Sequence, residues 1–123
     1  MRTIEDHKVN PCNDKITLTV TDEPGEGGAC HKYRMEYDPD NNGYIQAQTI
    51  AFQNGPIAEV GTNGITQEVL LAIVIDRLRS FQAGPYACRE NAQALTKIEE
   101  AQHWLHSRTL KRMVRGVEGT HKV

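Results

Sequence analysis

Residues 66–91 decide the fold, because they contain the first arm and the turn of a helical hairpin. This stretch reads TQEVLLAIVIDRLRSFQAGPYACREN. Thr66 is a residue type that caps helix N-termini well, and Glu68 lies in the first turn, where the helix dipole favours an acidic side chain. Gly84-Pro85 is a pair at which helices stop. A first helix is therefore predicted from Thr66 to about Gln82.

A second helix is predicted from about Tyr86 to Arg115, with Gly116 as its C-terminal stop. At about 30 residues it would be about 45 Å long, against about 25 Å for the first helix. In an antiparallel hairpin its C-terminal end extends beyond the first helix. Apolar residues on this overhang need cover from the sheet or from another chain, so we expect an oligomer that forms through the helices. They are Leu105, Leu110, Met113 and Val114.

The first half of the chain predicts a short antiparallel β-meander. Three segments alternate apolar and polar residues with the two-residue period of half-buried strands. They are 16–21, 32–37 and 44–52. Turn-forming residues fill the intervals between them. The predicted fold class is α+β, with a strand-rich part over 1–63 and a helical hairpin over 64–123, and the 123 residues predict a single domain.

Charge is distributed unevenly between the two halves. Hydrophobic residues make up 38% of the chain, charged residues make up 24%, and the formal net charge is -2. Residues 1–63 hold five Lys or Arg against ten Asp or Glu, whereas 64–123 hold nine against six. Four of the basic residues lie within 101–117, which contains no acid. A local basic cluster on an acidic chain indicates a compact anionic target rather than a long polymer.

Composition also narrows the classes of protein. The two serines, Ser80 and Ser107, both lie in predicted helices without a glycine elbow, so a serine hydrolase is hard to build. No Walker loop occurs. Three cysteines do not suit a secreted disulfide framework, and the polar start does not resemble a signal peptide, so we expect a cytoplasmic protein. The apolar run 69–75 is too short to span a bilayer.

Polar residues interrupt the apolar faces of both predicted helices. Arg77 falls on the apolar stripe of the first helix, while Asn91, Arg108 and Arg112 fall on the face of the second helix. The stripe is formed by Leu70, Ile73, Val74, Leu78 and Phe81. Considered one at a time, the Asn91 amide would bond to nearby backbone and the arginine side chains would extend to solvent. Considered together, the residues suit a nucleotide. The arginines offer forked donors to phosphate, Phe81 offers a flat face to a base, and Asn91 offers an amide to a base edge or ribose. The set contains no nucleophile or general base, which favours binding over turnover.

These candidate residues fall into two groups. Asn91 and Arg108 are 17 positions apart, which is about 25 Å along a straight helix. Arg77, Phe81 and Asn91 lie near the closed end of the hairpin, and Arg108 and Arg112 lie near the open end. One chain cannot bring both groups onto one small ligand. Two hairpins packed head to tail would, and two-fold symmetry would form the pocket twice.

Other interpretations stay open. His103 and His106, one turn after Glu99, have a spacing that suits a metal, but no fourth ligand is evident and a solvated helix face is the preferred interpretation. The sequence therefore predicts no metal, cofactor or catalytic residue. Two rival functions are an adaptor that binds nucleic acid or protein through the basic end of the second helix, and a nucleotide hydrolase.

The hairpin resembles the phage Thoeris anti-defence sponge family, whose hairpin is shared with the anti-CBASS cyclic-nucleotide sponge. The strand-rich first half points to the Thoeris branch. The residues that carry the resemblance are Ile75-Asp76-Arg77-Leu78, Phe81-Gln82, Gly84-Pro85, Cys88-Arg89-Glu90-Asn91, Ala94-Leu95 and Arg108, and the closing stretch Arg112, Arg115-Gly116-Val117-Glu118-Gly119-Thr120-His121.

The resemblance implies a function that the residues alone do not give. Members of this family bind cyclic ADP-ribose isomers, notably glycocyclic ADP-ribose, made by bacterial TIR-domain immune proteins, and hold them uncleaved in pockets between subunits. It implies a homodimer or higher homo-oligomer in the cytoplasm of the infected host, and a possible second site for CBASS cyclic oligonucleotides. By motif position, Phe81, Asn91, Arg108 and Arg112 match the expected pocket residues.

Overall fold

The computed structural model describes all 123 residues and divides into two compact units. A strand unit contains Met1–Gly55 and Val60–Ile65, and a helical unit contains Pro56–Glu59 and Thr66–Val123. An antiparallel sheet followed by a helix pair confirms the predicted α+β class. That both units form one domain stays a prediction.

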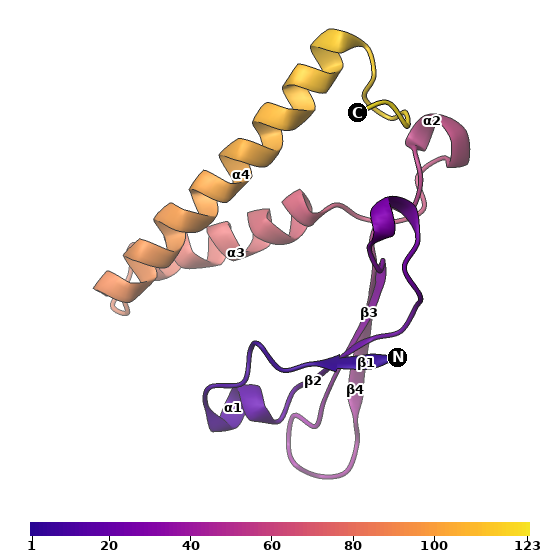
Figure 1. Cartoon of the computed structure of the whole chain (residues 1–123). Coiled ribbons are helices and arrows are strands. Elements are labelled where there is room, and N and C mark those ends of the chain that lie inside the picture. Colours follow the sequence, from indigo (N-terminus) through magenta and orange to yellow (C-terminus); the bar gives the residue numbers. More distant parts are fainter. The chain divides into compact units, whose positions relative to one another are not determined.

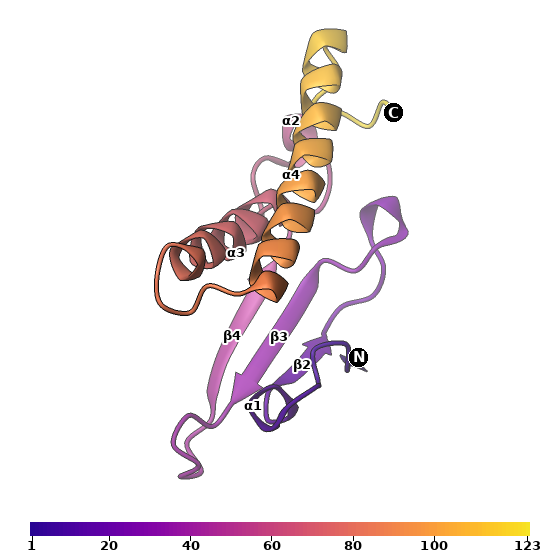
Figure 2. The ribbon, with the colours of Figure 1, turned by 90° about the vertical axis from the view of Figure 1, so that its left-hand side faces the viewer.

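The strand unit is a four-stranded antiparallel meander in the order β1-β2-β3-β4. Figure 2 shows β2, β3 and β4 of this sheet side by side. Its strands are β1 (Arg2–Ile4), β2 (Thr17–Val20), β3 (Lys32–Tyr37) and β4 (Gln46–Ala51). Alternation located β2, β3 and β4, and the predicted bounds of β3 are confirmed. The three-strand prediction was wrong at the N-terminus, because β1 has only three residues and forms by pairing with β2. The single turns α1 (Pro11–Asp14) and η1 (Glu26–Gly28) lie in the loops.

A few apolar side chains stabilise the sheet. Val20 is 1% exposed and stands opposite Tyr33 in the β2–β3 register. The ring of Tyr33 meets that of Phe52 edge-on, with centroids 5.7 Å apart. Backbone pairing of Phe52 with Ile65 then brings the chain back alongside the end of the sheet. The core of this unit therefore lies at the N-terminal end of β3, where the rings of Tyr33 and Phe52 meet.

Gly64 makes the return strand possible, and its replacement gives a first test of the fold. A Cβ at this position would lie 2.4 Å from the carbonyl carbon of Phe52 and 2.6 Å from the backbone oxygen of Ala51. Because backbone atoms cannot yield as a flexible side chain can, Gly64→Ala is expected to lower the midpoint of thermal unfolding of the strand unit by several degrees. Gly61→Ala is not a clean control, since Gly61 has φ 73°, so Thr62→Ala serves instead. Equal midpoints for Gly64→Ala and Thr62→Ala would contradict the close approach.

The helical unit is built on α3 (Gln67–Gln82) and α4 (Arg89–Arg115) (Figure 1). As predicted, Thr66 caps α3, and its hydroxyl accepts a hydrogen bond from the Val69 amide. Gly116 ends α4 in the left-handed conformation with φ 72°. The predicted start of α4 at Tyr86 was wrong. Tyr86 and Ala87 stay in the turn, because the Cys88 thiol accepts from the Asn91 amide and caps the helix there.

The buried face of α3 differs from the predicted stripe. Ile75 is the buried apolar residue of this helix, whereas Ile73 and Val74 are 61% and 42% exposed. Arg77 also lies on the exposed side. The helix α3 has apolar residues on more than one side. Only the side that contacts α4 is packed. An exposed apolar surface therefore remains on α3.

The open end of α4 extends beyond α3, as predicted. The Gln102 side-chain amide donates to the Glu68 carbonyl at 3.0 Å, so the N-terminus of α3 lies level with Gln102. The remainder of α4, to Arg115, continues past this point (Figure 1). On it Leu110 is 60% exposed and Val114 is 90% exposed. None of the helices combines the length and apolar character needed to cross a membrane.

Candidate functional site

The closed end of the hairpin carries an aromatic and cationic cluster. The guanidinium of Arg77 lies over the Phe81 ring, 5.1 Å from its centroid. Tyr86, in the turn, meets Phe81 edge-on at 6.4 Å. Asn91 is half-buried in the first turn of α4. A base that stacks on Phe81 therefore takes the ring face opposite Arg77 or displaces that guanidinium.

The open end carries a basic hollow of about 300 Å³. It is lined by Trp104, Ser107, Arg108, Lys111, Arg112, Arg115 and Val123. Trp104, Arg108, Lys111 and Arg115 follow one another at intervals of three or four positions, so they share one face of α4. The lining contains four cations and no carboxylate side chain. Such a surface attracts an anion with more than one negative charge.

Arg112 is held by the chain that follows α4 and is almost entirely buried. It is 8% exposed, and its Nε donates to the Glu118 carboxylate at 3.0 Å. One terminal nitrogen donates to the backbone oxygens of Val117 and Thr120 at 2.9 and 3.1 Å, and the other to that of Lys122. The alternative that this arginine extends to solvent was wrong. These residues form what we call the Arg112 clasp.

The clasp also receives a segment from the middle of the chain. The short helix α2 spans Ile57–Val60, and its residues up to Glu59 pack in the helical unit. The Ala58 amide donates to the Gly119 carbonyl at 3.0 Å. His121 and Glu59 pair at 2.9 Å. The chain end after α4 is therefore fixed from two sides.

Within one protomer the two ends stay apart. Because α4 is an unbroken helix of 27 residues, Asn91 and Arg108 are separated by about 25 Å. Arg77, Phe81 and Asn91 lie at the closed end, and Arg108 and Arg112 line the open-end hollow. The structure thus brings the predicted residues together as two groups. No single hairpin places both groups on one small molecule.

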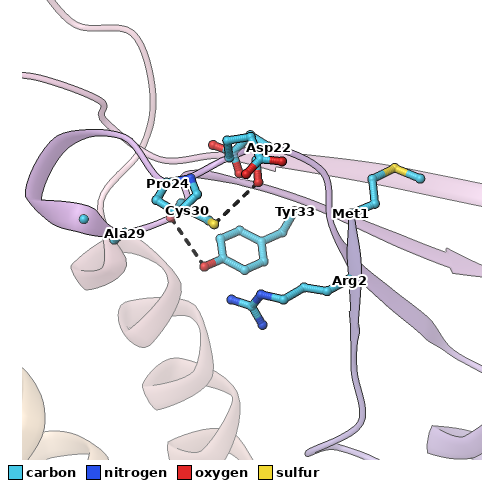
Figure 3. Close-up of a pocket in the computed structure, with 9 residues that line it drawn as sticks. Met1, Arg2, Asp22, Pro24, Ala29, Cys30 and Tyr33 are labelled. Atoms are coloured by element: carbon cyan, nitrogen blue, oxygen red, sulfur yellow. Dashed lines mark hydrogen bonds between the residues drawn. The ribbon is translucent and has the colours of Figure 1, made fainter.

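The strand unit has a separate hollow of about 370 Å³ (Figure 3). Arg2 extends into it beside Tyr33, whose hydroxyl bonds to the Cys30 carbonyl at 3.5 Å. Its lining includes two acidic side chains, Asp22 and Glu23, against one basic side chain, Arg2. This balance disfavours a phosphate. The open end of α4 is therefore the better anion site of the two.

Asp22 closes the loop between β2 and β3. Its carboxylate accepts from the His31 amide at 2.9 Å and from the Lys32 amide at 3.1 Å. The His31 hydrogen bond is the main cause that lowers the pKa of this carboxyl, with burial opposing it. The ionised form is thus favoured in the folded strand unit.

A pH dependence follows from Asp22. Because its pKa is lower in the folded than in the unfolded chain, it contributes stability above the unfolded pKa, and that contribution is lost as pH falls through the folded value. Asp22→Asn is expected to unfold at a lower temperature than wild type at about pH 6, with a difference that narrows toward about pH 3. Thermal unfolding followed by circular dichroism measures both, and Glu23→Gln is the control. A constant difference across this range would refute the assignment.

The comparison with known families concerns the hairpin. A family model described as "Acb2/Tad1, hairpin domain" matches residues 45–110, which is more than half of the 123-residue chain. The chain belongs to the Acb2/Tad1 hairpin family. The matched range contains Arg77, Phe81, Asn91 and Arg108, whereas Arg112 lies just beyond it.

A curated relative of this Acb2/Tad1 chain is "Thoeris anti-defense 1" of Bacillus phage SBSphiJ7. The two are 55% identical over 74 residues, which cover 60% of this chain and 52% of the relative. The chain therefore spans about half the length of that relative. The resemblance to the anti-defence sponge family is confirmed by the family and the relative together.

Sequence reasoning missed part of the open-end group. Trp104 lines the hollow with three residues of the basic cluster, Arg108, Lys111 and Arg115, but it was not among the predicted site residues. The helical spacing of 104, 108, 111 and 115 is the signal that would have found it. Glu99, considered as a metal ligand beside His103, instead pairs with Arg79 at 2.7 Å. No group of three or more His, Cys, Asp or Glu is placed to hold a metal ion.

Proposed function

We propose that this Acb2/Tad1 chain binds a cyclic ADP-ribose isomer made by TIR-domain immune proteins and holds it without cleaving it. Glycocyclic ADP-ribose is the form expected. Such sequestration in the infected host's cytoplasm keeps the signal from its effector. Support comes from the family and from the phage relative named Thoeris anti-defense 1.

The observation that carries the proposal is the hollow at the open end of α4, whose lining has four basic and no acidic side chains. It presents Arg108, Lys111, Arg112 and Arg115 around about 300 Å³. A pyrophosphate carries two charges and several acceptor oxygens, which suit the forked donors of arginine. A nucleotide also needs partners for its base and its ribose. The closed end supplies that chemistry with Phe81 and Asn91.

We infer that each pocket joins the closed end of one hairpin to the open end of another. In this arrangement Phe81 stacks on a base and Asn91 bonds to a base edge or ribose, with Arg77 beside them. Arg108 binds phosphate. Arg112 contributes charge from within its clasp, because direct contact with phosphate would require it to exchange carbonyl partners.

Exposed apolar surface supports assembly. The chain buries three apolar residues, Val20, Ile75 and Val117, which is a small core for 123 residues. Apolar side chains on both helices are left in water, and association through the hairpins would cover them. They include Ile73, Val74, Leu110, Met113 and Val114. A homodimer or higher homo-oligomer is therefore part of the proposal.

The test is capture followed by release. Purified protein is incubated with glycocyclic ADP-ribose, washed and heated, and the released molecules are identified by mass spectrometry. We expect the intact molecule, at one per protomer by calorimetry. A changed product would indicate a hydrolase. Absence of capture, with salt-sensitive binding of an oligonucleotide instead, would favour the adaptor. A second site for CBASS cyclic oligonucleotides stays a prediction without assigned residues.

A further inference from the structure

Trp104 occupies an unusual position at the open end of α4. It is 68% exposed and lines the same hollow as Arg108 and Lys111. Tryptophan has the largest apolar side chain. Leaving it exposed to water therefore gives up more of the free energy of apolar burial than exposing any other residue. An exposed indole beside a group of cations therefore needs an explanation beyond packing within the hairpin.

Contacts of the indole leave a face for a ligand. His103 meets Trp104 with a centroid distance of 5.6 Å and an interplanar angle of 69°. In an edge-to-face pair, one ring presents only its edge, so at most one face of the indole is covered. The large exposed fraction of Trp104 agrees with one face of the indole being open to solvent. Stacking of a base on such a ring contributes without regard to base sequence.

Two of the surrounding cations are uncommitted. Arg112 is held in its clasp, and Arg115 donates to a terminal backbone oxygen of Val123 at 2.8 Å. The side chains of Arg108 and Lys111 have no carboxylate partner and make no hydrogen bond in the structure. The positive charge available to a phosphate therefore lies at Arg108 and Lys111, on the same helix face as the indole.

We propose that Trp104 and Lys111 belong to the ligand site, the indole stacking on a purine base and the ammonium pairing with a phosphate of the same nucleotide. This inference rests on the proposed function and extends it. It assigns a second aromatic platform to the pocket, beside the uncommitted cations of the open end. Trp104 then sets the preference for a purine nucleotide over the bare pyrophosphate.

The chain reports on this proposal directly, because Trp104 is its single tryptophan. Intrinsic fluorescence of the full chain is titrated with glycocyclic ADP-ribose while calorimetry measures binding in parallel. We expect an emission typical of a water-exposed indole before ligand, and quenching that saturates with the calorimetric curve. Binding by calorimetry without any change in emission would overturn the role of Trp104 and leave the proposed function standing. Absence of heat would overturn both.

Variants separate stacking from a contact between copies. Trp104→Leu is expected to weaken binding about 5- to 150-fold, and Trp104→Phe by a smaller factor. Lys111→Met is expected to weaken it about tenfold, and Lys97→Met, exposed on the same helix outside the hollow, should bind as wild type. Pyrophosphate alone should lose affinity with Lys111→Met but not with Trp104→Leu. If ligand-free emission is already that of a buried indole, or if Trp104→Leu changes assembly and not affinity, the ring covers a neighbouring copy and the proposal fails.

Discussion

Replacing Arg108 by alanine is expected to weaken the binding of glycocyclic ADP-ribose by about 10- to 100-fold. A forked, charge-assisted contact to phosphate contributes about 1.5–3 kcal/mol. Arg108 lines the open-end hollow and has no partner that its loss would leave unpaired. Its removal should therefore change affinity without changing the thermal stability of the helical unit. Calorimetry and thermal unfolding of the same preparation measure the two effects.

Matched variants make this expectation specific. Lys97→Ala removes one cation from an exposed position of α4 outside the hollow and should bind as wild type. Phe81→Ala should lose about 1–3 kcal/mol of binding, since base stacking is of that size. Asn91→Ala is expected to act in the same direction. Unchanged affinity in all three pocket variants would refute the site.

Replacing Arg112 by methionine is expected to destabilise the helical unit by about 2–3 kcal/mol. The buried guanidinium donates to Glu118 and to three backbone oxygens, and methionine keeps only the apolar stem. The pairing of the Val117 amide with the Arg112 carbonyl should open more often as the turn loosens. Thermal unfolding and hydrogen exchange of Val117–Lys122 measure the loss.

The neighbouring Arg115 provides the control for the clasp. It is exposed and donates to a single backbone oxygen, that of Val123 at the end of the chain, so Arg115→Met should cost less than about 1 kcal/mol. If Arg112→Met is as stable as Arg115→Met, the clasp contributes nothing and Arg112 is free to act as a ligand residue. If Arg112→Met is unstable, any loss of binding must be compared at a temperature where the variant is folded.

Local signals were enough to predict the hairpin from the sequence. Thr66 and Gly116 have the side-chain and backbone properties that begin and end a helix, and both bounds are confirmed. The strand β3 has a clear two-residue period. The strand β1 could not be predicted, because its three residues are ordered by pairing with β2 and carry no period of their own.

The candidate site was predicted less completely, for physical reasons. Periodicity identifies an apolar face but not which of two such faces packs, so Arg77 was assigned to the packed face and lies on the exposed side. The burial of Arg112 depends on the turn from Val117 to Lys122, which no helical pattern describes. Trp104 was not among the predicted site residues, because residue type alone does not report exposure.

The sharing of each pocket between two hairpins is tested most directly by mixed assemblies. Chains with Phe81→Ala and chains with Arg108→Ala are co-expressed with different affinity tags, and dimers that carry both tags are purified. A pocket built from two chains predicts one site of full affinity per mixed dimer, about half the wild-type capacity, although each variant alone binds weakly. If mixed dimers bind no better than the two parents, the residues that hold the ligand lie in one chain and the shared pocket is wrong.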